Sequence, residues 1–172
     1  MKTLIIYGSV EGQTRKIARF AAEKITEMGH EVEVIDADDP AGIAFDGVEA
    51  VILAASVHQR RHPRNFEALI TAQAADLAKA KTLLISVSLN AAFPEGRDEA
   101  AEYLAEMEMR TNFKPDEEML LGGAVRTAHY DYFAMQVLRH VIMRDKPFDP
   151  SVSDHEFTDW DALSAQLKSF LN

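Results

Sequence analysis

Two hydroxyl side chains and a glycine lie close together near the start of the sequence, in the stretch SVEGQT of residues 9–14. Ser9 and Thr14 supply hydroxyl donors, and Gly12 lets the backbone approach a ligand closely. A helical pattern follows directly, and a helix N-terminus offers unpaired N–H groups and partial positive charge. Together these groups suit the oxygens of a phosphate. The alternative is an ordinary helix N-cap after a tight turn.

A second chemically distinctive stretch is SVHQRRHPR, residues 56–64, which holds three arginines, two histidines and no acid. The chain as a whole has a formal net charge of −10, so this stretch reverses the charge locally. Because a guanidinium can bind a carboxylate through two parallel hydrogen bonds, the stretch predicts a binding rim for a polyanionic substrate. The residues assigned to this rim are Arg60, Arg61, His62 and Arg64. The alternative is a solvated loop whose arginines pair with surface carboxylates.

Regular elements must position these segments, and the periodicity of the apolar residues predicts which elements they are. Short apolar or alternating runs indicate five strands, at 2–7, 31–36, 50–56, 81–88 and 118–125. Apolar residues at helical spacing indicate helices at 13–28, 65–75, 97–110, 130–143 and 158–171. The last helix is expected to begin with a capping box formed by Thr158 and Asp161.

Strands that alternate with helices predict an α/β protein with a doubly wound, five-stranded parallel sheet. The sequence contains no linker, repeat or low-complexity tract, so residues 1–172 are expected to form a single domain. In such sheets ligands bind beyond the carboxyl ends of the strands. The segments expected to meet at that edge are 8–14, 56–64, 88–97 and 126–132.

Composition and motifs exclude several classes of function. The chain has no cysteine, which rules out disulfides, thiolate catalysis and cysteine-bound metal clusters. The histidines are scattered and the metal-binding motif H-E-x-x-H is missing, so we expect no metal. The nucleoside-triphosphate loop G-x-x-x-x-G-K-[ST] and the dinucleotide motif G-x-G-x-x-G are missing too. The negative charge argues against nucleic acid as a partner. The sequence shows neither a secretory segment nor a bilayer-spanning run, so we expect a cytoplasmic protein.

The stretch SVEGQT resembles the phosphate loop of flavodoxins, usually S/T-x-T-G-x-T, from which Glu11 departs. This resemblance implies the sheet order 2-1-3-4-5 and FMN as the cofactor. A narrower similarity rests on EGQTR after the first strand, the basic stretch after the third, GGAVR with a later tyrosine after the fifth, and a closing TDW. From residue 1 to about 171 the chain resembles the bacterial menaquinone-dependent protoporphyrinogen oxidase family.

The flavodoxin resemblance also implies which residues hold the FMN. The predicted cofactor-binding residues are Ser9, Val10, Glu11, Gly12, Gln13 and Thr14, with Ser56, Val57, His58, Ser88, Leu89 and Asn90. Glu11 is expected to contribute only its backbone, because a carboxylate beside a phosphate is unfavourable. The loop lacks the Trp or Tyr that commonly stacks on the flavin, so His58, Phe93 and Tyr130 remain alternatives. Arg97 is a further candidate for the anion rim.

Residues 130–143, YDYFAMQVLRHVIM, are apolar at ten of fourteen positions. A helix of this length spans roughly 21 Å, which is too short to cross a membrane. The pattern favours a core helix packed against the sheet. The family resemblance strengthens the alternative, an interfacial segment that reaches a quinone in lipid. In that case the protein would lie peripherally on the inner face of the plasma membrane. Residues 144–157 are predicted to form a loop with two prolines.

The resemblance implies an FMN oxidoreductase of haem biosynthesis that oxidises protoporphyrinogen, an anionic tetrapyrrole, and passes electrons to a quinone. The sequence itself assigns no catalytic side chain, because flavin carries the hydride and electron chemistry. Two alternatives remain, a flavodoxin-type electron carrier and an NAD(P)H:quinone reductase. The basic stretch 56–64 favours a small anionic substrate, because electron carriers of this family usually surround the flavin with acidic residues.

Overall fold

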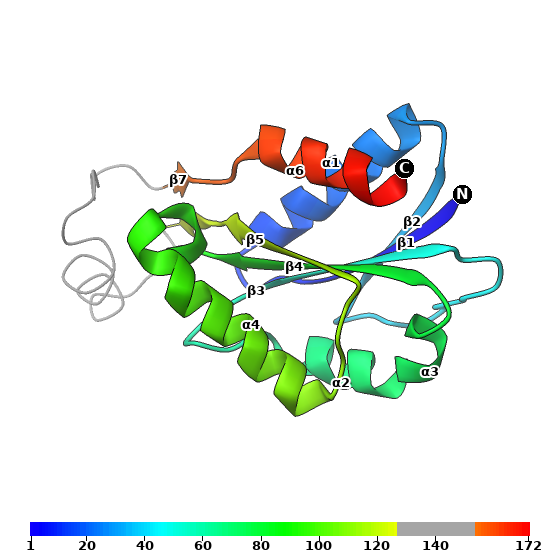
Figure 1. Cartoon of the computed structure of the whole chain (residues 1–172), viewed down its shortest axis with the longest axis horizontal. Helices are drawn as coiled ribbons and strands as arrows, with labels where there is room; N and C mark the ends of the chain where they lie inside the picture. Colours follow the sequence, from blue (N-terminus) through cyan, green and yellow to red (C-terminus); the bar gives the residue numbers. More distant parts are fainter. Residues whose placement is uncertain (127–153) are drawn as a thin grey trace.

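The computed structural model describes residues 1–126 and 154–172. A five-stranded sheet forms its centre, and helices cover both faces of that sheet (Figure 1). The strands are β1 (Lys2–Gly8), β2 (Glu31–Asp36), β3 (Ala50–Ser56), β4 (Lys81–Ser88) and β5 (Glu117–Gly122). All pairings are parallel and the order is β2-β1-β3-β4-β5, which confirms the predicted order.

The central strands are mainly apolar because both of their faces are covered. In β3, for example, every residue except the last is buried. The edge strand β2 keeps an alternating pattern and buries fully only Ile35. Burial on both sides therefore explains why apolar runs mark the inner strands.

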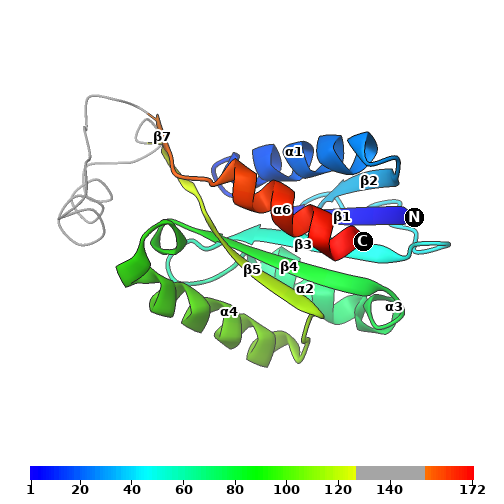
Figure 2. The same ribbon diagram turned by 45° about the horizontal axis from the view of Figure 1, so that its top comes forward.

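Helices α1 (Gln13–Glu27) and α6 (Trp160–Leu171) pack on one face of the sheet. Helices α2 (Arg64–Ala72), α3 (Ala74–Leu77) and α4 (Arg97–Thr111) lie on the other (Figure 2). Two short 3-10 turns, η1 (Asn90–Ala92) and η2 (Pro94–Gly96), connect β4 to α4. The predicted helix 65–75 is therefore two helices, because the chain leaves helical geometry at Gln73.

The predicted fifth strand, 118–125, is wrong in its extent. The sheet strand β5 ends at Gly122, and β6 (Ala124–Arg126) pairs antiparallel with β7 (Asp154–Glu156). A Cβ atom on Gly122 would lie 2.5 Å from the carbonyl oxygen of Phe157, so the returning chain passes directly over this glycine. The N–H of Phe157 also donates to the carbonyl oxygen of Gly123 at 2.9 Å. Residues 154–156, predicted as loop, are thus a strand.

The predicted start of the C-terminal helix is also wrong. The cap is Asp159, whose side chain accepts a hydrogen bond from the N–H of Ala162 at 3.0 Å. The Thr158 hydroxyl instead donates to the carbonyl oxygen of Gly122 at 2.7 Å. Tertiary contact therefore decided between two neighbouring residues that both favour caps.

The remaining predicted elements are the helix that could contact a membrane and the loop that follows it. The expected helix 130–143, with Tyr130, and the expected loop before residue 154 lie outside the described residues. Within the two described ranges, every helix is too short or too polar to traverse a bilayer.

Candidate functional site

The loops after β1, β3 and β4 meet at the carboxyl edge of the sheet, on the left in Figure 1. The strand register aligns their ends, because Gly8 pairs with Ala55 and Ser88 pairs with Gly122. The β6–β7 ribbon extends from the same edge, directly beyond the end of β5. The parallel sheet thus brings together the predicted segments 8–14, 56–64 and 88–97.

The loop after β1 has the geometry of an anion cradle. Gly12 occupies the left-handed region with φ of 97° at the cap of α1, and its N–H donates to the Ser9 hydroxyl oxygen at 2.9 Å. The Thr14 side chain is fully buried, and its hydroxyl has no hydrogen-bond partner within the described residues. An unsatisfied buried hydroxyl is costly. A bound phosphate oxygen would satisfy it, so the loop fits a phosphate.

Gln13 links this loop to the chain that returns through β7. Its Nε2 atom donates to the Thr158 hydroxyl at 3.0 Å and to the Glu156 carboxylate at 3.2 Å. Glu156 also accepts hydrogen bonds from Lys16 at 2.5 Å and from Trp160 at 2.9 Å. Burial alone would raise the pKa of Glu156, but these three donors outweigh it and lower the pKa. The Gln13 side chain is therefore engaged inside the protein, where it ties the loop after β1 to the returning chain.

The loop after β3 contains a strained turn at residues 58–61. His58 and Arg61 exchange two backbone hydrogen bonds, of 2.8 and 3.2 Å. The two residues between them, Gln59 and Arg60, have φ values of 50° and 65°. Neither is a glycine, and consecutive left-handed residues cost free energy that the surroundings must supply. Such outliers concentrate at functional sites.

The three arginines of the predicted rim differ in their partners. Arg61 binds Glu67, and Arg60 binds Glu99 at 3.0 Å. Arg64, at the start of α2, is exposed, and no described residue pairs with its side chain. The positive charge of the predicted rim is therefore partly neutralised. This agrees in part with the alternative that the arginines of this loop pair with carboxylates of the protein itself.

His62 lies beneath the turn rather than on the rim. Its side chain is 2% exposed, and its Nε2 atom forms a 2.8 Å hydrogen bond with the Ser86 hydroxyl. Burial is the main cause that lowers the pKa of His62 to about 4, against a raising effect from Glu67. The imidazole is therefore neutral near pH 7 and adds no positive charge to a surface rim. A histidine inside a run of charged residues gave no sign of this burial.

Two of the side chains predicted to lie at a flavin ring have local hydrogen-bond partners. The Ser88 hydroxyl accepts a hydrogen bond from the N–H of Ala91 at 3.1 Å. The Asn90 side chain donates to the Tyr103 hydroxyl at 3.3 Å. The Ser56 hydroxyl, by contrast, is buried without a partner among the described residues, so it remains available to a ligand. Val57, His58 and Leu89 lie in the same two loops.

Sequence reasoning missed the acids that organise the basic loop. Glu67 is buried on α2, beside the apolar Phe66 and Ile70. An acid at a core-facing position of an amphipathic helix is unusual unless it is paired, so this position carried a usable signal. No comparable sign in the sequence indicates that Glu99 pairs with an arginine, because the first turn of a helix commonly holds exposed acids.

A cavity of about 280 Å³ lies between α4 and β5, away from the phosphate loop. Its lining residues are Arg97, Ala101, Leu104, Ala105, Glu108, Lys114, Glu118 and Leu120. Arg97 donates to the carbonyl oxygen of Ala91 at 2.9 Å, so its guanidinium is held here. Burial is the largest cause that raises the pKa of Glu108 to about 7, and its hydrogen bond with Glu118 adds to it, whereas Lys114 lowers it.

Glu108 should make stability depend on pH. Its pKa is higher in the folded chain than its ordinary 4.5, so the folded state holds the proton more tightly between those values. The resulting stabilisation is present below pH 4.5 and is lost as the pH rises through about 7. We expect Glu108→Gln to raise the melting temperature relative to the wild type, increasingly from about pH 5 to about pH 8. Glu102→Gln, an exposed change on the same helix, should show a constant difference, and equal profiles for both variants would contradict the role of Glu108.

Comparison with known proteins gives three results. The flavodoxin domain family matches residues 4–151. Among curated proteins, protoporphyrinogen IX dehydrogenase [quinone] of Escherichia coli K12 is 24% identical over 165 residues, which cover 95% of this chain and 91% of that protein. The same protein from Escherichia coli O157:H7 gives identical values.

Solved structures agree with the fold. Oxidised flavodoxin 1 from Bacillus cereus has a TM-score of 0.59 and 20% identity, covering 99% of this chain and 97% of its own. Flavodoxin 2 from Bacillus cereus has a TM-score of 0.54 and 16% identity, covering 99% and 98%. At these identities the similarity concerns the fold, and it agrees with the sheet order described above.

Proposed function

This chain belongs to the flavodoxin domain family, an FMN-binding oxidoreductase family, and we propose that it dehydrogenates a carboxylated tetrapyrrole and passes the electrons to a quinone. The resemblance to protoporphyrinogen IX dehydrogenase [quinone] over 95% of the chain supports this choice of substrate and acceptor. FMN, when bound, supplies the hydride and electron chemistry. The residues of this chain bind the cofactor and orient the substrate.

The cofactor would be held by the two loops whose buried hydroxyls have no partner among residues 1–126 and 154–172. The Thr14 hydroxyl and the backbone N–H groups at the start of α1 would bind the phosphate. The Ser9 hydroxyl could join them, because its oxygen accepts from the N–H of Gly12 and its hydrogen donates to no residue in the described part of the chain. The Ser56 hydroxyl, at the end of β3, would meet the ring system.

The excess of arginine beside this site is the observation that carries the substrate assignment. Four guanidinium groups lie around the 58–61 turn and α2, and three carboxylates of the described residues, Glu67, Glu99 and Glu106, pair with them. The four are Arg60, Arg61, Arg64 and Arg110. Arg64 is therefore left without a carboxylate partner among the described residues, and a guanidinium pairs well with the propionate carboxylates of a tetrapyrrole.

The experiment compares electron donors for the purified, FMN-loaded protein. Protoporphyrinogen with menadione should support turnover, and NADH with menadione should not. Turnover with NADH and none with protoporphyrinogen would make the protein an NAD(P)H:quinone reductase. Inactivity with both donors, together with reduction by a protein partner, would make it an electron carrier.

Arg64 gives the corresponding mutational prediction. We expect Arg64→Ala to raise the KM for the tetrapyrrole by about two- to fivefold, because the lost contact is well solvated. The affinity for FMN should stay unchanged, and the effect should fade at high salt as the charges are screened. Arg19→Ala removes an equally exposed arginine from α1 and serves as the control for net charge. A KM that is equal in both variants at low salt would remove Arg64 from the substrate site.

A further inference from the structure

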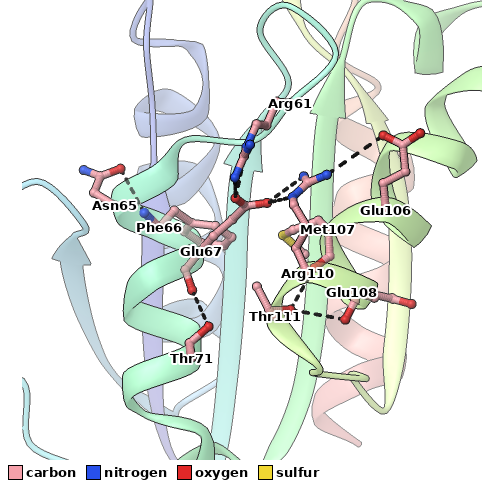
Figure 3. Close-up of polar contacts among 10 residues, drawn as sticks. All are labelled: Arg61, Asn65, Phe66, Glu67, Thr71, Glu106, Met107, Glu108, Arg110 and Thr111. Atoms are coloured by element: carbon pink, nitrogen blue, oxygen red, sulfur yellow. Dashed lines mark hydrogen bonds and ion pairs between the residues drawn. The ribbon is translucent and has the colours of Figure 1, made fainter.

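The neighbouring residues Arg60 and Arg61 are held in very different ways. Arg61 donates two hydrogen bonds to one oxygen of Glu67, at 3.3 and 3.1 Å. Arg110, from α4, donates two to the other oxygen, at 2.9 and 2.6 Å (Figure 3). Only 7% of the Glu67 side chain is exposed. Withdrawing Arg61 would leave a buried carboxylate less well paired, so Arg61 is committed to this contact.

Arg60 is held by an exposed pair instead. Its side chain is 63% exposed and its partner Glu99 is 43% exposed, with 3.0 Å between their nearest charged atoms. The guanidinium carbon also lies 5.3 Å from the centroid of the Tyr103 ring. Exposed ion pairs stabilise weakly, so Arg60 can exchange one carboxylate for another at little cost.

The Glu99 carboxylate is fixed from its own side. The Tyr103 hydroxyl, one helical turn further along α4, donates to the same Glu99 oxygen that Arg60 binds, at 2.6 Å. Asn90, from the loop after β4, donates in turn to the Tyr103 hydroxyl. The Arg60–Glu99 pair therefore joins the 58–61 turn to α4, and Asn90 ties the loop after β4 to the same group of residues. Both loops border the proposed flavin site.

We propose that Glu99 is a specificity-determining residue, which occupies Arg60 in the free protein until a substrate carboxylate replaces it. This inference rests on the proposed tetrapyrrole function and assigns a regulator of substrate entry to that site. Ligands without a carboxylate cannot compensate Arg60 for the loss of Glu99, so the exchange selects carboxylated ligands. Arg61 takes no part in it, because its partner is buried.

The test is a titration of the FMN-loaded protein with coproporphyrin, a soluble tetracarboxylate porphyrin, followed by fluorescence anisotropy at low salt. Glu99→Gln should bind it about two- to fivefold more tightly than the wild type, the range expected for release from an exposed ion pair. Glu102→Gln changes the charge equally on an exposed position of the same helix and should have a smaller effect. In the Arg60→Ala background the advantage of Glu99→Gln should disappear, because the two residues act through one contact.

Two further measurements separate the possible failures. Tyr103→Phe keeps the ring under Arg60 but removes the donor to Glu99, and it should tighten binding in the same direction. A tetracationic porphyrin should gain nothing from Glu99→Gln. Equal coproporphyrin affinity in Glu99→Gln and Glu102→Gln would overturn the role of Glu99 while leaving the proposed function intact. A wild type that binds FMN but no coproporphyrin would overturn both.

Discussion

Replacing Thr14 with valine is expected to weaken FMN binding by roughly ten- to hundredfold, the loss of one hydrogen bond to a charged group. Valine has nearly the same shape, so the substitution removes the hydroxyl and leaves the packing of the fully buried side chain in place. That hydroxyl lacks a partner among the described residues, so it has no competing hydrogen bond to give up on binding FMN. Titration of the apoprotein with FMN, followed by quenching of flavin fluorescence, measures the change.

The matched control is Thr26→Val, the same substitution at an exposed position of the same helix. It should leave FMN affinity unaltered. Adding Ser9→Ala to Thr14→Val should weaken binding further, although Ser9 also accepts the Gly12 N–H, so that step disturbs the loop as well. If Thr14→Val and Thr26→Val bind FMN alike, the phosphate does not contact the Thr14 hydroxyl.

Glu67→Gln is expected to lower the free energy of unfolding by about 2–4 kcal/mol, somewhat below the usual cost of breaking a buried ion pair because both arginines reach solvent. The neutral amide of glutamine cannot compensate the positive charges of Arg61 and Arg110. Its NH2 group would also point at one of the two guanidinium groups, where both partners are hydrogen-bond donors and no bond can form. Urea denaturation at saturating FMN, with the same FMN concentration for every variant, measures the loss.

The control for this prediction is Glu27→Gln, which breaks an ion pair between Glu27 and Lys24. The Glu27 side chain is 64% exposed. That change should cost less than about 1 kcal/mol. Adding Arg110→Ala to Glu67→Gln should recover part of the lost stability, since it removes one of the two unbalanced cations. Losses of equal size in Glu67→Gln and Glu27→Gln would mean that the buried carboxylate does not hold α2, α4 and the turn together.

Much of the fold was predictable because it depends on local patterns. A strand between two neighbours and two helical layers is buried on both faces and must be largely apolar, as the runs AVILAA in β3 and LLI in β4 are. Parallel strands place their following loops at one edge, so the meeting of 8–14, 56–64 and 88–97 also followed from the pattern. The phosphate loop was visible because hydroxyls, a glycine and a helix start are adjacent in sequence. The predicted FMN cofactor is confirmed by the family match.

The parts that could not be predicted depend on contacts between distant residues. Arg110 reaches Glu67 across 43 positions, and Gln13 reaches Thr158 across 145. No local rule distinguishes Thr158 from Asp159 as the cap of α6, because each has a suitable oxygen and only the carbonyl of Gly122 decides. The burial of His62 likewise follows from Ser86 on the neighbouring strand and not from its charged sequence neighbours.

The packing of α6 has a consequence for the order of events during synthesis. Leu163, Leu167 and Phe170 are fully buried in the cluster that includes Ile17 of α1 and Ile85 of β4. The opposite face of the sheet is closed by α2 and α4, which leave the ribosome earlier because chains emerge N-terminus first. A nascent chain can therefore bury one face of its sheet well before the other. Until α6 emerges, the part of the second face that Leu163, Leu167 and Phe170 cover presents apolar surface, while α1 already packs on the rest of that face.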